Sequence, residues 1–94
     1  MRRVMHGDVV AAGCALLAVP EAGRARLLSR MLAEAEAADR HRRATGRAHP
    51  VWGTGSLMSA ALARDRVAEP FLDDRAYAEC LALVFEVLAR RARG

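Results

Sequence analysis

Lysine is absent from this sequence of 94 residues, and aromatic residues make up only 4% of it. The lack of lysine excludes the phosphate-binding P-loop, whose pattern requires one. The low aromatic content is atypical of a β-sandwich, whereas abundant alanine favours closely packed helices. The apolar run of residues 9–19 has about half the length that a bilayer-spanning helix needs. We therefore interpret this run as a buried helix of a cytoplasmic protein without a membrane segment.

Cysteine and histidine are also scarce. The two cysteines, Cys14 and Cys80, and the three histidines, His6, His41 and His49, form no CxxC or HxxxH pair. Such pairs are typical of metal sites, so no metal or cofactor is expected. Both cysteines lie in apolar segments, where burial raises the pKa of a thiol and makes it unreactive. No serine has the context of a catalytic triad, and we expect no enzymatic activity.

Capping and breaking residues predict an all-α fold, a single four-helix domain over residues 1–94. Asp8 is expected to cap the first helix, and Pro20 to end it and begin the second. The second helix is expected over about residues 21–45, with Gly46 as its C-terminal stop. At about 1.5 Å per residue it measures roughly 37 Å, so its latter half should project from the domain. Charges spaced by four predict ion pairs along it: Arg30 with Glu34, Glu36 with Arg40, and Asp39 with Arg43.

Two shorter helices are expected to follow. Ser56 can cap a third helix over about residues 57–66. Asp73 or Asp74 can cap a fourth over about residues 74–92.

The fourth helix is unusually apolar. Between residues 77 and 88 only Glu79 and Glu86 are charged, which predicts apolar side chains around most of its circumference. A domain this small cannot cover such a helix on every side, so one face is left for self-association or another protein. The alternative is a central helix wrapped by the other three. The predicted partner or oligomer interface comprises Leu83, Val84, Val87, Leu88, Arg90 and Arg91.

The chain's single tryptophan, Trp52, lies in a polar turn broken by glycines. We interpret Gly53 and Gly55 as turn residues and Ser56 as a helix cap, with the indole packed on the corner between the second and third helices. A glycine-rich turn that enters a helix can also bind anions. Without the lysine of a P-loop, the structural interpretation is favoured.

Arginine is concentrated at the end of the second helix. The net charge of +4 favours association with polyanions. The predicted DNA-binding residues are Arg40, Arg42, Arg43 and Arg47. No base-reading pattern accompanies them, so contact would be with phosphates and sensitive to salt. The alternative is that these arginines only solvate the helix end, where its dipole favours cations.

The string GRAHPVWGTGSLMSAALAR, with MRRVMHGDVVAAG before it and EPFLDDRAYAECLALVFEVL after it, resembles a family of short alphaproteobacterial proteins. These are encoded at the head of gene transfer agent clusters, beside the large terminase. The resemblance covers essentially the whole chain.

This resemblance implies a small terminase subunit, a non-enzymatic adaptor that delivers DNA to the packaging motor of a phage-like particle. The implied partners are the large terminase, double-stranded DNA and further copies of the chain. Phage small terminases usually carry an N-terminal helix-turn-helix, whereas residues 1–20 here predict one apolar helix. The DNA contact is therefore expected to be non-specific. The alternative is a regulatory or structural protein-binding module that does not contact DNA.

Overall fold

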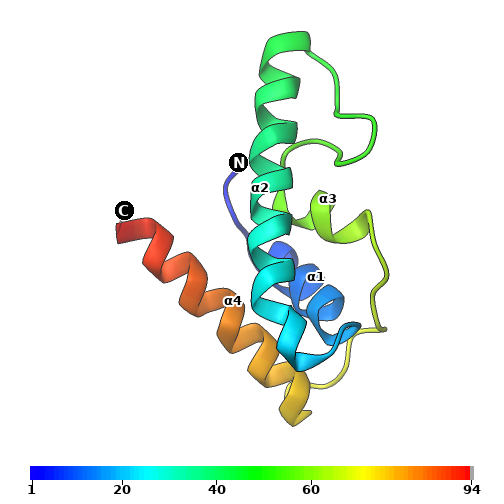
Figure 1. The fold of residues 1–94 in the computed structure, drawn as a ribbon, viewed down its shortest axis with the longest axis vertical. Helices are drawn as coiled ribbons and strands as arrows, with labels where there is room; N and C mark the ends of the chain where they lie inside the picture. The colour runs from blue at the N-terminus through cyan, green and yellow to red at the C-terminus, as the bar shows by residue number, and fades with distance from the viewer. Residues whose placement is uncertain (94) are drawn as a thin grey trace.

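The structure, a computed structural model, describes residues 1–93 and contains four helices in that range (Figure 1). They are α1 (His6–Leu17), α2 (Glu21–Thr45), α3 (Leu57–Leu62) and α4 (Arg75–Arg93). The all-α prediction is confirmed. Helix α1 packs against the other three, while α4 contacts mainly α1 and touches α2 only slightly. None of the described helices combines the length and apolar character needed to cross a membrane.

Helix α1 begins earlier than predicted, because Asp8 caps it from the third position of the helix instead of preceding the helix. One carboxylate oxygen of Asp8 accepts a hydrogen bond from the amide of the N-cap residue, Met5, at 2.8 Å. An acidic side chain at the third helical position can satisfy the N-cap amide in this way. The other oxygen accepts the amide of Met58 at 2.8 Å. The prediction of Asp8 as the N-cap is therefore wrong, and this buried side chain instead joins the beginnings of α1 and α3.

Helix α2 has its predicted bounds. It ends where Gly46 adopts a left-handed φ of 73° and donates its amide to the carbonyl of Arg42 at 2.8 Å. Its buried stripe comprises Leu28, Met31, Leu32, Ala35 and Ala38. The latter half was expected to project from the domain. It does not project freely, because Met1 and Gly55 pack against the buried Asp39.

Two of the three ion pairs predicted within α2 are replaced by pairs to other parts of the chain. Glu34 pairs with Arg64, which follows α3, and Glu36 pairs with Arg91 of α4. The third pair, between Asp39 and Arg43, is present. Glu34 and Glu36 therefore hold neighbouring elements in place instead of pairing within α2.

Helix α3 is about one turn shorter than predicted. Its cap is confirmed, since Oγ of Ser56 accepts the amide of Ser59 at 3.0 Å. After Leu62 the chain turns towards α1, and the amide of Val67 donates to the carbonyl of Cys14 at 3.2 Å. This long-range bond takes the place of a further helical turn.

Helix α4 is capped by Asp74, whose Oδ1 accepts the amide of Tyr77 at 3.0 Å. Gly13 lets α1 approach it closely, because a Cβ there would lie 2.8 Å from the side chain of Leu81. The buried face carries Tyr77, Cys80 and Val84, flanked by the partly buried Leu81, Leu83, Val87 and Leu88. The opposite face is exposed and includes Glu79, Ala82, Glu86 and Arg90. An apolar surface around most of the circumference is not confirmed, and the central helix is α1.

Candidate nucleic-acid interface

The last turns of α2 place several cations around one buried carboxylate. Asp39 is 2% exposed and accepts hydrogen bonds from Nη2 of Arg42 at 2.8 Å and from Nε of Arg43 at 3.1 Å. The ammonium group of Met1 lies 3.3 Å from the same carboxylate. The hydrogen bonds from Arg43 and Arg42 hold the pKa of Asp39 well below its usual range, against the opposing effect of desolvation. Asp39 therefore stays ionised at neutral pH and offsets one positive charge.

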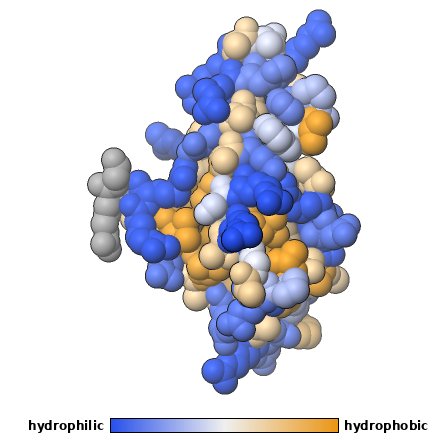
Figure 2. All heavy atoms as spheres, viewed as in Figure 1, coloured by the Kyte–Doolittle hydropathy of each residue, from blue (hydrophilic) through white to orange (hydrophobic). Residues whose placement is uncertain are grey.

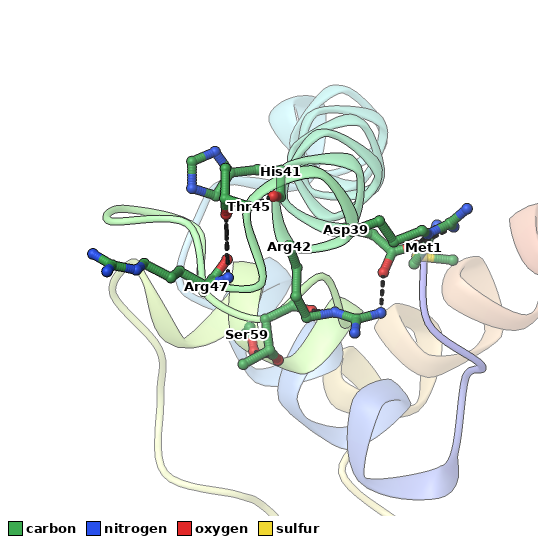
Figure 3. Close-up of polar contacts among 9 residues, drawn as sticks. Met1, Asp39, His41, Arg42, Thr45, Arg47 and Ser59 are labelled. Carbon is green, nitrogen blue, oxygen red and sulfur yellow. Dashed lines mark hydrogen bonds and ion pairs between the residues drawn. The ribbon is translucent and has the colours of Figure 1, made fainter.

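Arg42 also connects α2 to the loop of residues 46–56. Its Nε donates to the carbonyl of Thr54 at 3.1 Å. Figure 3 shows the Arg42 side chain extending from α2 past Ser59 towards Asp39, while Arg47 points away on the other side of the helix end. Arg42 and Arg47 therefore extend in different directions from the end of α2 and do not line a single face.

Gly53 and Gly55 have the turn roles predicted for them. Their φ angles are 80° and 96°, in the left-handed region that residues with a Cβ rarely adopt. A Cβ on Gly55 would also lie 2.6 Å from Cα of Asp39. The loop backbone therefore packs directly on α2 and covers the buried carboxylate.

Trp52 is half-buried and stacks on a histidine of its own loop. Its ring lies 4.6 Å from that of His49, centroid to centroid, at an interplanar angle of 7°. His49 in turn contacts the ring of His41 on α2 edge to face, at 5.2 Å. Nδ1 of His49 accepts the amides of Val51 and Trp52, both at 3.1 Å. The indole thus stacks on a ring of its own loop, and His49 connects this stack to His41 of α2, an arrangement that the sequence did not indicate.

The N-terminal segment brings two further arginines towards this end of α2. Besides the contact of Met1 with Asp39, the amide of Arg2 donates to the carbonyl of Gly55 at 2.8 Å. Arg2 and Arg3 are exposed and line a neighbouring pocket that Ser56 also borders. No local sequence pattern predicts this contact, because Arg2 and Gly55 lie about fifty residues apart in the chain.

We call Arg2, Arg3, Arg40, Arg42, Arg43 and Arg47 together the basic end of α2. Arg40 and Arg47 are exposed, and neither forms an ion pair within residues 1–93. Figure 2 shows that hydrophilic residues cover most of this part of the molecule, at the top of the view. The arrangement leaves a positive surface of which Asp39 neutralises only a part, and such a surface attracts phosphates.

The predicted oligomer interface is only partly on the surface. Val84 is 0% exposed and belongs to the subunit's own core, so its assignment to an interface is wrong. Leu83, Val87 and Leu88 are partly buried against that core. Arg90 and Arg91 are exposed, and Arg91 forms the ion pair with Glu36 described above.

The cysteine and tyrosine side chains of the core have pKa values that are raised by their apolar surroundings. Burial raises the pKa of the Cys14 and Cys80 thiols, as predicted. Burial likewise raises the pKa of Tyr77, whose hydroxyl has no hydrogen-bond partner within the described chain. Over residues 1–93, no three His, Cys, Asp or Glu side chains gather where they could hold a metal ion.

These features define a small all-α domain with a basic helix end. Residues 2–88 match the model of a family described as a domain of unknown function (DUF7742), and the chain belongs to that family. No curated protein and no solved structure matches it.

Proposed function

We propose that this protein is a non-enzymatic DNA-packaging adaptor of the small terminase type, acting in the cytoplasm. It contacts double-stranded DNA through the basic end of α2, associates with itself and engages the large terminase. The observation that carries the proposal is the gathering of six arginines around the end of α2, of which Asp39 pairs with only two, Arg42 and Arg43. The resemblance to gene transfer agent proteins supplies the packaging role.

Two features support contact with the phosphate backbone over reading of bases. Helix α3 has six residues, about a turn and a half, and its first turn is tied to α1 through Asp8. It is thus poorly suited to lie along a major groove as a recognition helix does. Arg42 and Arg47 extend in different directions from the end of α2, which suits phosphates approached from more than one direction.

The salt dependence of DNA binding tests this proposal. Arg40→Ala combined with Arg47→Ala removes two exposed guanidinium groups and leaves the network around Asp39 intact. The slope of log K against log salt concentration is negative, and each lost phosphate contact should reduce its magnitude by about 0.9. The magnitude for the double variant should therefore be smaller than that of the wild type by up to about 1.8. Fluorescence anisotropy with a labelled duplex at several salt concentrations measures this slope.

The matched control is Arg26→Ala combined with Arg30→Ala. Both residues are exposed on the same helix, so this variant loses the same charge away from the basic end. Its slope should stay close to that of the wild type. Equal slopes for the two double variants would show that the charge of the whole molecule, and not the basic end of α2, determines binding.

A protein-binding module without DNA contact is the second candidate, and the exposed apolar residues favour it. Phe71, Leu72 and Phe85 are 87%, 72% and 55% exposed, which is unusual for such large apolar side chains. A wild-type protein with no measurable affinity for duplex DNA at low salt, but retained by immobilised large terminase, would favour this candidate.

A further inference from the structure

The segment between α3 and α4 presents two large apolar side chains to solvent. Phe71 is 87% exposed and Leu72 72% exposed, and we call this pair the apolar knob. Pro70 precedes the pair, and the amide of Asp74 donates to the carbonyl of Phe71 at 3.1 Å. The turn and the proline restrict the backbone, so the knob is ordered before it meets a partner.

An apolar pocket of about 230 Å³ lies beside the second half of α4. We call it the α1/α4 pocket, and its lining residues are Val4, Met5, His6, Val9, Phe85 and Leu88. Met5 and Phe85 are 72% and 55% exposed, so the pocket is open to solvent. A cavity of about 150 Å³ can hold a benzene molecule, and the α1/α4 pocket is therefore large enough for a phenyl ring.

The knob and the pocket carry opposite charges around them. Glu69, Asp73 and Asp74 flank the knob in sequence. Arg2 and Arg3 immediately precede the pocket-lining segment, and Met5 lines both this pocket and the one bordered by these arginines. Glu86 lies beside Phe85, and Arg90 follows Glu86 four residues later on the same helix. An acidic residue four positions before a basic one is a favourable spacing on a helix, so Arg90 offsets the charge of Glu86. This complementarity favours the knob as the occupant of the pocket.

The knob cannot reach the pocket of its own subunit. It lies just before Arg75, the first residue of α4, whereas Phe85 lies ten residues further along that helix. Ten residues correspond to about 15 Å along the helix axis. The two surfaces therefore lie at different ends of α4, and a contact between them has to join two copies.

We propose that the apolar knob of one copy inserts into the α1/α4 pocket of the next copy, with Phe71 as the anchor. Because the two surfaces differ, the contact is head-to-tail and can be repeated, giving a closed ring or an open chain according to the rotation between copies. The proposal rests on the self-association in the proposed function and identifies the surfaces that produce it.

Complementary variants test this contact. The knob variant carries Phe71→Ser and Leu72→Ser, and the pocket variant carries Phe85→Glu, which also repels the acidic residues beside the knob. All three replaced side chains are largely exposed, so the helical circular dichroism should be unchanged. Met5→Glu is a second pocket variant, and Leu62→Ser is the control because Leu62 is 52% exposed on α3, away from both surfaces.

Sedimentation velocity over a range of concentrations measures the association. The wild type and Leu62→Ser should form the same oligomers, whereas the knob and pocket variants alone should associate at least about tenfold more weakly. An equimolar mixture of the knob and pocket variants should form a dimer and nothing larger. In that mixture one intact knob meets one intact pocket, and the chain cannot continue.

Three results would overturn the proposal. They are a wild type that stays monomeric at high concentration, knob and pocket variants that associate like the wild type, and a mixture that fails to form the dimer. A monomeric wild type would exclude a second copy as the occupant of the pocket. All variants keep the basic end of α2, so DNA titrations on the same samples report on the proposed function separately.

Discussion

Replacement of Gly55 by alanine tests directly how the loop of residues 46–56 docks on α2. The φ of Gly55 is 96°, and a Cβ would lie 2.6 Å from both Cα and Cβ of Asp39 and 2.9 Å from its amide nitrogen. Two of these atoms belong to the backbone of α2, so no change of rotamer relieves the clash. The loop has to move away from the helix, or the helix has to distort.

The expected loss has two parts. A left-handed backbone costs a residue with a Cβ about 1–2 kcal/mol, and overpacking costs a further 1–3 kcal/mol. Gly55→Ala should therefore lower the free energy of unfolding by about 2–5 kcal/mol, a large fraction of the roughly 5–14 kcal/mol of a domain of this length. With a urea m value of about 1.5 kcal/mol/M, a loss of about 3 kcal/mol lowers the midpoint by about 2 M.

Urea unfolding followed by circular dichroism measures this loss, with Gly23→Ala as the matched control. Gly23 lies in the first turn of α2, and a Cβ there meets no atom within 4 Å. Alanine is the better helix former, so the control should be unchanged or more stable by up to about 1 kcal/mol. A Gly55→Ala variant within about 0.5 kcal/mol of the wild type would refute the close packing of the loop on Asp39.

Two further predictions concern buried polar groups. Asp39→Asn should lower stability at neutral pH, and the exposed Asp73→Asn should not. The folded-state pKa of Asp39 lies below the unfolded value of about 3.9, so its contribution is complete above that pH and is lost as the pH falls through the folded pKa. Urea midpoints between neutral and strongly acidic pH should therefore fall less steeply in Asp39→Asn, and parallel curves would contradict this. Tyr77→Phe should leave stability unchanged or raise it by about 1 kcal/mol, because the buried hydroxyl lacks a partner in the described chain. A loss above about 1 kcal/mol on thermal unfolding would reveal a hydrogen bond to that group.

The helical class and most of the helix ends follow from local patterns in the sequence. Gly46, Ser56 and Asp74 act on backbone groups within four residues of themselves, so their effects are visible in a local pattern. The same holds for the bounds of α2 and for the turn glycines. The four arginines predicted for the interface likewise lie near the end of one helix because they are close in sequence.

The partners of the polar side chains, in contrast, depend on how the helices pack together. Asp8 spans fifty residues to reach Met58, and Glu34 and Glu36 turn from their own helix to Arg64 and Arg91. A charged side chain pairs with the nearest suitable group, and that group is fixed by how the helices pack.

Packing also determined which helix is central and which apolar residues remain exposed. Helix α1 takes the central position because it packs most extensively against the other three helices, and Gly13 allows α4 to approach it closely. Val84 is thereby enclosed, while Phe71 and Leu72 are left in solvent. A helical pattern gives the direction of a side chain from its own axis, but the depth of its burial depends on neighbours that are distant in sequence.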